Sequence, residues 1–404
     1  MTSTVGIDAL GVAVPSTCVR LEDLAVARNV EPAKFLQGLG TRVMGVALPD
    51  EDTVTLAARA AHEALQSAGV RGDEVGLLAV GTETAVDHSK PVASYVQGLV
   101  GIGSNCRVFE TKHACYGGTA ALQLALDWIR SGSARGRKAL VICSDIARYG
   151  VGTPGEPTQG AGAVAILLGE APRLVALEPG VSGVYSQDVH DFWRPLYSKD
   201  ALVDGHYSVK CYLDALEGAW RNYRELVAEV PPAGSFFSDR FAALAYHVPY
   251  GKLARKGHQR LRELDGDPTP DTSFARLVEP GLVLPSLVGN IYTGSLYLSL
   301  TSLLACHPGS LEGQRVGLFS YGSGSCAEFF GGTVQPGAHA RVRALGLMER
   351  LEARRVLGIP EYEAIMRERE LIDERPAGAA TETGAFGYLG VEQERRTYAR
   401  RGAA

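Results

Sequence analysis

Residues 106–129 read CRVFETKHACYGGTAALQLALDWI, and this stretch decides the fold. Residues 106–109 are predicted to form a short strand and residues 112–115 a turn. Residues 116–129 carry Ala and Leu on nearly every face, and a helix that is apolar all round is a buried one. The sequence therefore predicts a buried helix that begins directly after Cys115.

The same alternation of strand and helix continues along the chain. Short apolar runs of the kind that form buried strands span residues 5–14, 75–80, 139–144, 161–168, 241–247 and 316–321. Helical patterns span residues 53–68, 209–227, 253–264 and 296–304. Together they indicate an α/β fold with a mostly buried sheet. The length of 404 residues suits two domains or two fused halves.

Composition and charge exclude several classes of protein. The net charge is −5 and there is no basic arm, so we expect no nucleic-acid partner. No run approaches the roughly 18 apolar residues that cross a bilayer, and the N-terminus does not resemble a secretory signal. Seven scattered cysteines without a C-x-x-C pair indicate a reduced, cytoplasmic chain. Neither the cysteines nor the histidines have the spacing of a metal site.

The C-terminal part of the chain is highly charged. Residues 341–372 predict surface helices that are broken at residues 358–360. A basic cluster near the end is expected to be a solvated tail, and it consists of Arg395, Arg396, Arg400 and Arg401.

Cys115 is the sharpest chemical feature of the sequence. A helix N-terminus carries partial positive charge and free N–H groups, which would lower the pKa of the thiol and could bind an oxyanion. Gly117 and Gly118 would let a substrate approach the backbone closely. The alternative is an inert buried cysteine, which is common.

Glu83 and His247 each follow a predicted buried strand. A buried carboxylate has a raised pKa and suits acid–base work, and a histidine there can bind a carbonyl or move a proton. An ordinary loop glutamate and a core histidine are the alternatives. Taken with Cys115, these residues suit nucleophilic acyl transfer followed by proton abstraction. A papain-like Cys/His pair is also open, although it gives Glu83 no role.

Three motifs resemble those of 3-hydroxy-3-methylglutaryl-CoA (HMG-CoA) synthases. Residues 110–121 (ETKHACYGGTAA) resemble the nucleophile segment of that family, residues 81–90 its catalytic-glutamate segment, and residues 246–252 (YHVPYGK) its catalytic-histidine segment. Further matching segments follow in order, at residues 144–147, 191–195, 203–208, 289–294, 319–324 and 395–401.

The resemblance implies a thiolase-like fold with five layers, αβαβα, built from two fused halves and active as a homodimer. The N-terminal half, residues 1–170, would carry Glu83 and Cys115. The C-terminal half, residues 171–404, would carry His247 and Asn290. The implied chemistry begins with transfer of an acetyl group from acetyl-CoA to Cys115. Glu83 would then remove a methyl proton, and the resulting carbanion would attack acetoacetyl-CoA. Hydrolysis would release HMG-CoA, a step of the mevalonate pathway to isoprenoids.

The resemblance also implies the groups that hold the substrates. His247 would bind the acetoacetyl thioester, and two lysines would face the phosphates of CoA. No cofactor beyond the two CoA substrates is implied. The implied binding or supporting residues are Asp145, Thr158, Asp191, Ser208, Lys252, Lys256, Asn290, Ser320 and Tyr321.

Three positions depart from the family pattern, and alternatives stay open. His113 stands in place of an amide side chain, His206 in place of a lysine, and Gly251 in place of a larger residue. A related reaction in polyketide pathways uses the same triad with substrates on acyl carrier proteins. A thiolase or ketoacyl synthase III would pair its cysteine with other residues. A catalytically dead binding module would not need the intact triad.

Overall fold

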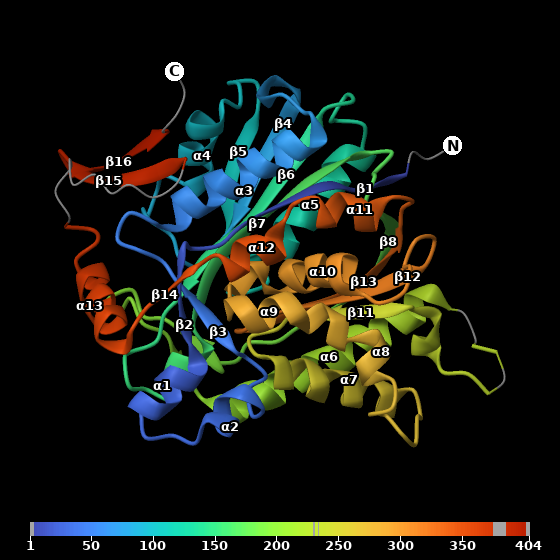
Figure 1. Ribbon diagram of the computed structural model, residues 1–404. Helices are drawn as coiled ribbons and strands as arrows, with labels where there is room; N and C mark the ends of the chain where they lie inside the picture. Colours follow the sequence, from blue (N-terminus) through green and yellow to red (C-terminus); the bar gives the residue numbers. More distant parts are fainter. Residues whose placement is uncertain (1–3, 229–230, 233, 375–384, 401–404) are drawn as a thin grey trace.

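One hydrogen-bonded sheet forms the centre of the molecule, with strand order β11-β12-β13-β8-β1-β7-β6-β4-β5 (Figure 1). The computed structural model describes residues 4–228, 231–232, 234–374 and 385–400. The strands of this sheet are β1 (Val5–Ala13), β4 (Val75–Gly81), β5 (Arg107–Thr111), β6 (Lys138–Ala147), β7 (Gly160–Glu170), β8 (Val175–Ser186), β11 (Ala243–Tyr246), β12 (Arg315–Gly322) and β13 (Cys326–Val334).

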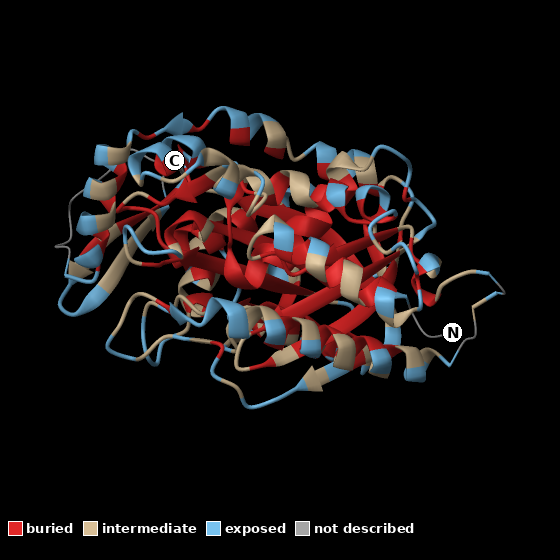
Figure 2. Ribbon diagram, turned by 90° about the horizontal axis from the view of Figure 1, so that it is seen from below, coloured by how far each residue is buried: buried red, intermediate tan, exposed pale blue. Residues whose placement is uncertain are grey.

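Helices cover both outer faces of the sheet and fill the space between its two halves (Figure 1). The helices of these layers are α3 (Thr53–Ala68), α4 (Val92–Val100), α5 (Gly117–Arg130), α6 (Gly205–Val227), α7 (Gly251–Leu264) and α10 (Ser295–Cys306). Helices α5 and α10 lie inside, α3 and α4 cover one half, and α6 and α7 cover the other. The five layers that the resemblance implies are thus confirmed. In Figure 2 most strands of the central sheet are buried, apart from β5 and much of β8, whereas the outer helices alternate between buried and exposed residues.

The two halves of the sheet join where β1 pairs with β8, Gly6 opposite Ala176 and Ile7 opposite Val175. The predicted division after residue 170 falls between the end of β7 and the start of β8. The division into halves stays a prediction, because one sheet runs through both segments.

Several predicted elements have the expected bounds for the expected reasons. Helix α3 spans Thr53–Ala68, as predicted, because Asp52 caps its N-terminus and Gly69, with φ of 67°, ends it. Helix α6 begins at Gly205, four residues earlier than predicted, because the Asp204 carboxylate accepts a hydrogen bond from the Tyr207 N–H.

The predictions for the charged C-terminal region are partly wrong. The predicted break at residues 358–360 overlaps the observed one, which runs from Ala353 to Gly358, and α13 (Ile359–Glu370) begins two residues earlier than that break allowed because Pro360 fits its first turn. Arg369 is only 4% exposed and donates to three backbone carbonyls. The predicted tail forms a hairpin of β15 (Phe386–Glu392) and β16 (Arg395–Arg400) whose first strand packs on α3. The Arg396 side chain is only 9% exposed. Arg401 lies outside the described residues.

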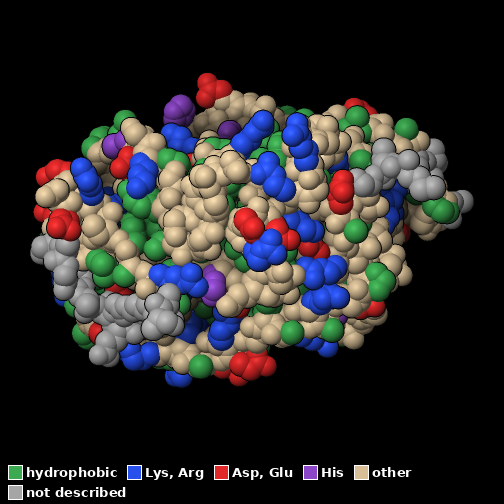
Figure 3. Space-filling model, turned by 90° about the horizontal axis from the view of Figure 1, so that it is seen from above, with side chains coloured by type: hydrophobic (Ala, Val, Ile, Leu, Met, Phe, Trp, Pro, Cys, Tyr) green, Lys and Arg blue, Asp and Glu red, His purple; other side chains and the backbone are tan. Residues whose placement is uncertain are grey.

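Smaller elements complete the fold. They are β2 (Thr17–Arg20), β3 (Val43–Val46), β9 (Phe192–Trp193), β10 (Leu202–Val203), β14 (Arg355–Val356), α1 (Leu21–Ala27), α2 (Pro32–Leu36), α8 (Phe274–Leu277), α9 (Val283–Val288), α11 (Ala338–Arg343) and α12 (Leu347–Glu352). Within the described ranges, no helix has the length and apolar character needed to cross a membrane. Figure 3 shows Lys and Arg side chains in small groups on the upper face, interspersed with acidic side chains.

Two glycines let helix α5 pack closely against the sheet. A Cβ added to Gly118 would collide with Cys143 Sγ, and one added to Gly81 would collide with the Gly118 backbone. Gly118 therefore serves helix–strand packing, whereas the sequence indicates a close approach of substrate at this position.

We expect Gly118→Ala to lower the free energy of unfolding by about 1–3 kcal/mol, because the new methyl group overpacks the contact between α5 and β6. Chemical denaturation checks this. Gly98→Ala is the matched control, since Gly98 is exposed in α4 with open space around its Cα, and we expect it to leave stability unchanged or raise it. Equal stability of the two variants would contradict the packing argument.

Candidate active site

The three candidate catalytic residues all follow the carboxyl ends of parallel strands. Glu83 comes after β4, Cys115 lies between β5 and α5, and His247 comes after β11. Strands β4 and β5 pair in parallel, as do β11 and β12. Loops at this end of a sheet are the usual place for ligands.

Cys115 and Glu83 are in direct contact. The Cys115 thiol donates a hydrogen bond to Glu83 Oε1 at a distance of 3.2 Å. Burial, followed by the Glu83 carboxylate, raises the pKa of Cys115 well above its usual value of 9.0. The sequence-based expectation of a lowered thiol pKa is therefore wrong, because burial beside acidic groups outweighs the helix N-terminus. The thiol needs a base to become a nucleophile.

Glu83 has the environment of an acid–base residue. Its side chain is 6% exposed, and burial raises the pKa of its carboxyl group to about 8, with the nearby Asp145 adding to the rise. Arg194 opposes it, with Nη2 lying 3.3 Å from Glu83 Oε2. A carboxyl group with a pKa near neutrality can both accept and return a proton.

Asp145 holds the loop that carries Glu83. Its buried carboxylate accepts hydrogen bonds from the Glu83 N–H at 2.9 Å, the Thr84 hydroxyl at 2.7 Å and the Thr82 hydroxyl at 2.8 Å. Thr293 donates to its other oxygen from N–H and hydroxyl, at 3.1 and 2.5 Å. Because protein donors occupy this carboxylate, the contacts support a positioning role for it.

A second buried carboxylate connects three predicted site segments. Asp191 is fully buried and accepts hydrogen bonds from the Tyr321 hydroxyl at 2.7 Å, the Gly324 N–H at 3.0 Å and the Ser208 hydroxyl at 3.2 Å. These bonds join the predicted substrate-binding residues of α6 to the turn that follows β12. Asp191 lies 17 positions before Ser208 and 130 positions before Tyr321 in the sequence.

His247 is 2% exposed, and burial lowers the pKa of its imidazole to about 3. The ring is therefore neutral at physiological pH and can offer a hydrogen bond without a charge. Its centroid lies 6.5 Å from that of Tyr321.

The remaining predicted residues occupy distinct places. Asn290 Oδ1 accepts from the Tyr292 N–H at 2.9 Å and the Ser295 hydroxyl at 2.8 Å. The Ser320 hydroxyl accepts from Thr119 on α5 at 2.8 Å. The Thr158 hydroxyl donates to the Gly155 carbonyl at 2.7 Å. The two predicted phosphate-binding lysines, Lys252 and Lys256, lie in the first turns of α7.

A cavity of about 580 Å³ opens beside Glu83. Its walls include Phe192, Trp193, Arg194 and His113. Of the predicted catalytic and binding residues, all of which lie in the described part of the chain, Glu83 alone lines it.

Comparisons with known proteins agree over nearly the whole chain. The family model for the N-terminal part of hydroxymethylglutaryl-coenzyme A synthase matches residues 1–172, and that for the C-terminal part matches residues 175–272 and 268–377. The chain belongs to the hydroxymethylglutaryl-CoA synthase family. The chain is similar to hydroxymethylglutaryl-CoA synthase of Enterococcus faecalis, 39% identical over 90% of this chain and 92% of that one. It is also 35% identical to the polyketide biosynthesis 3-hydroxy-3-methylglutaryl-ACP synthase PksG of Bacillus subtilis, over 90% and 88% of the two chains.

Solved structures of this family superpose closely. MvaS in complex with 3-hydroxy-3-methylglutaryl coenzyme A has a TM-score of 0.94 and is 46% identical to this chain. The match covers 99% of this chain and 100% of MvaS. The curacin biosynthetic pathway HMG synthase in complex with acetyl donor-ACP has a TM-score of 0.90 and 32% identity, covering 98% and 99%. The fold is therefore thiolase-like, and this member of the HMG-CoA synthase family is an acyltransferase that forms carbon–carbon bonds.

Two residues close to Glu83 could not be singled out from the sequence of this synthase-family chain. Arg194 contacts the Glu83 carboxylate, whereas in the sequence it stands out only as part of a matching segment. Tyr149 is 9% exposed, and burial, followed by the charges of Cys115 and Glu83, raises the pKa of its hydroxyl. The sequence feature that could have indicated Tyr149 is its position just after β6. That strand is parallel to β4, so its carboxyl end lies on the same side of the sheet as Glu83.

The three departures from the family pattern have different surroundings. His113 lines the cavity beside Glu83, and its buried Nε2 has no hydrogen-bond partner among the described residues. His206 is exposed in the first turn of α6. A Cβ on Gly251 would lie 3.2 Å from the Gly40 carbonyl oxygen, so glycine permits a close approach of these two loops.

We expect alkylation of Cys115 by iodoacetamide to be slow near neutral pH and to rise steadily past about pH 9, because burial and Glu83 hold the pKa of the thiol high. Quantitative peptide mapping separates Cys115 from the other cysteines. Glu83→Gln is expected to shift the rise to lower pH, since it removes the neighbouring negative charge. A plateau already reached near neutral pH in the unsubstituted protein would contradict this account.

Proposed function

We propose that this chain is a hydroxymethylglutaryl-CoA synthase that condenses an acetyl group on Cys115 with acetoacetyl-CoA and releases HMG-CoA. The observation that carries the proposal is the 3.2 Å contact between the Cys115 thiol and a buried Glu83. It supports the proposal, because a thiol that is hydrogen-bonded to a carboxyl group with a pKa of about 8 can pass its proton to that group.

In the first step Glu83 takes the thiol proton, and the Cys115 sulfur adds to the carbonyl of acetyl-CoA. The bond from that carbonyl to the sulfur of CoA breaks, and the departing thiolate takes the proton back from Glu83. The amide groups at the start of α5 lie next to Cys115 in the chain and are suited to hold the transient oxyanion.

In the second step the Glu83 carboxylate removes a proton from the methyl group of the acetyl thioester. The resulting carbanion bonds to C3 of acetoacetyl-CoA, and the new alkoxide takes that proton from Glu83. The neutral His247 and the amide of Asn290 are suited to donate hydrogen bonds to the acceptor thioester. Water then cleaves the Cys115 thioester and frees the carboxylate of HMG-CoA.

The proposal places the nucleotide and pantetheine of CoA on the α7 side of the site. Lys252 and Lys256 supply the cations for the phosphates, and Ser208 and Thr158 are further groups that we propose contact the substrates. The reaction as proposed needs no cofactor beyond its substrates. A cytoplasmic homodimer acting in the mevalonate pathway completes the proposal, on the strength of the family resemblance.

A second candidate is the polyketide β-branching reaction, in which carrier proteins deliver both substrates. The likeness to PksG and to the curacin HMG synthase in complex with acetyl donor-ACP favours it. The higher identity to MvaS, 46% against 32%, favours free CoA thioesters.

Incubation with acetyl-CoA is expected to add one acetyl group to the protein, and Cys115→Ser is expected to abolish this adduct. Glu83→Ala should still become acetylated, more slowly, but should lose about a hundredfold or more in condensation, since the methyl proton then has no base. Intact-protein mass spectrometry and chromatography of HMG-CoA report the two steps. An adduct that forms only with an acetylated carrier protein would move the proposal to the second candidate, and normal condensation by Glu83→Ala would overturn the role of Glu83.

Reversing the charges of Lys252 and Lys256 together, by Lys252→Glu and Lys256→Glu, is expected to raise KM for acetoacetyl-CoA about tenfold with little change in kcat. Steady-state kinetics measures both. Arg341→Glu is the control, because Arg341 lies in α11 beside the β1 segment Asp8–Leu10, away from α7. An unchanged KM in the double variant would place the phosphates elsewhere.

A further inference from the structure

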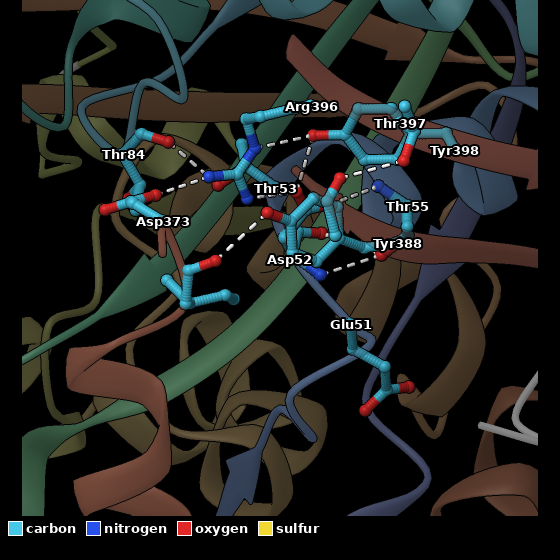
Figure 4. Close-up of polar contacts among 12 residues, drawn as sticks. Glu51, Asp52, Thr53, Thr55, Thr84, Asp373, Tyr388, Arg396, Thr397 and Tyr398 are labelled. Atoms are coloured by element: carbon cyan, nitrogen blue, oxygen red, sulfur yellow. Dashed lines mark hydrogen bonds and ion pairs between the residues drawn. The ribbon is translucent and has the colours of Figure 1, made fainter. Parts of the chain in front are cut away.

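Arg396 of β16 is a buried cation at the centre of a polar cluster (Figure 4). Its Nη2 lies 2.9 Å from Asp52 Oδ2, its Nη1 pairs with Asp373, and its Nε donates to the Tyr398 hydroxyl at 3.0 Å. The Tyr398 hydroxyl in turn donates to Asp52 Oδ2 at 2.7 Å. The guanidinium thus binds two carboxylates and a hydroxyl group through three different nitrogens, and its planar shape fixes the directions of all three contacts.

One route from this cluster reaches Glu83 through the N-terminus of α3. Asp52 caps that helix by accepting from the Thr55 N–H at 2.9 Å. The next residue, Thr53, donates its hydroxyl to the Thr84 carbonyl at 2.8 Å. Thr84 directly follows Glu83 in the chain, so the cap fixes one side of the glutamate loop (Figure 4).

A second route reaches Glu83 through the segment that carries Arg194. Asp373 binds both Arg396 and Lys199, the latter at 2.8 Å. Lys199 lies five residues after Arg194, which contacts the Glu83 carboxylate and also donates to the Glu83 carbonyl. Arg194 and Lys199 both line the cavity beside Glu83, as do Asp373 and Arg396.

We propose that Arg396 is a positioning residue for Glu83, acting through Asp52 and Thr53 on one side and through Asp373 and Lys199 on the other. The proposal rests on the function proposed above, in which Glu83 is the base. It gives the C-terminal hairpin a role in catalysis. Through the contact of Arg396 with Asp52, which lies 344 positions earlier in the chain, β16 holds the loop that carries Glu83.

The consequence for the site is that only 6% of the Glu83 side chain stays exposed, even though a cavity opens beside it. Burial is the largest cause of the raised pKa of Glu83, so loosening either route would let water in and lower that pKa. The charged and titratable groups that face the carboxyl group are Cys115, Asp145, Arg194, Tyr149 and Tyr292.

The test compares Arg396→Gln with Arg395→Gln, the exposed neighbour on the same strand. We expect Arg396→Gln to lower kcat for condensation about tenfold to a hundredfold, and to move the apparent pKa of the rate profile down from about 8 by about one unit or more. Arg395→Gln should keep both values. Arg396→Lys should fall between, because an ammonium cannot reproduce the three directed contacts.

Thr53→Val breaks the first route alone, with little change in shape, and should shift the apparent pKa in the same direction. The pH profile of Cys115 alkylation on the same variants reads the surroundings of Glu83 without any condensation. It should move to lower pH in Arg396→Gln and Thr53→Val, which tests the proposal even if the unsubstituted protein makes no HMG-CoA. Unchanged midpoints in both profiles, with only a loss of folded protein, would overturn the positioning role.

Discussion

Two carboxyl groups, Glu83 and Asp145, are buried side by side next to the Cys115 thiol, and the rest of the site depends on this costly arrangement. Burial of a charged group costs several kcal/mol of desolvation free energy unless hydrogen bonds to the group compensate for the lost water. Asp145 is compensated by the hydroxyl and N–H groups of the loop after β4 and of Thr293. Glu83 has fewer donors, and the imbalance keeps its pKa near neutrality, where a proton can be taken and returned.

The fold supplies this arrangement by joining residues that are distant in sequence. Strand β4 brings Glu83 and strand β6 brings Asp145, while the close packing of Gly118 on Cys143 sets the position of α5 and hence of Cys115. The other half of the molecule contributes His247 after β11 and Tyr321 at the end of β12, which is bonded to Asp191. Glu83 and Cys115 therefore follow β4 and β5 at one end of the sheet order, and the neutral imidazole of His247 follows β11 at the other.

Much of this could be predicted from the sequence, because strand ends and a buried helix leave local patterns. The bounds of α3 follow from a cap at Asp52 and a stop at Gly69, and Glu83, Cys115 and His247 each follow a recognisable strand or turn. The direction of the pKa of Cys115 could not be predicted. It depends on Glu83, whose contact with the thiol bridges 32 positions in the chain.

The pairing of the arginines escaped prediction for the same reason. Local composition suggested a solvated tail around Arg396, but its partner Asp52 lies at the other end of the chain. Arg369 is likewise satisfied by backbone carbonyls of residues 47–51. The sequence shows that a stretch is charged. Only the tertiary fold shows whether the charged side chains are solvated or paired with distant groups.

The most direct test of this account is an NMR titration of the Glu83 carboxyl group, with isotope-labelled glutamate and a Glu83→Gln sample to assign the signal. A midpoint near pH 8 is predicted, because burial and Asp145 both disfavour the charged form. A midpoint near the ordinary value of 4.5 would show a solvated carboxylate and contradict the central claim that burial makes Glu83 the base.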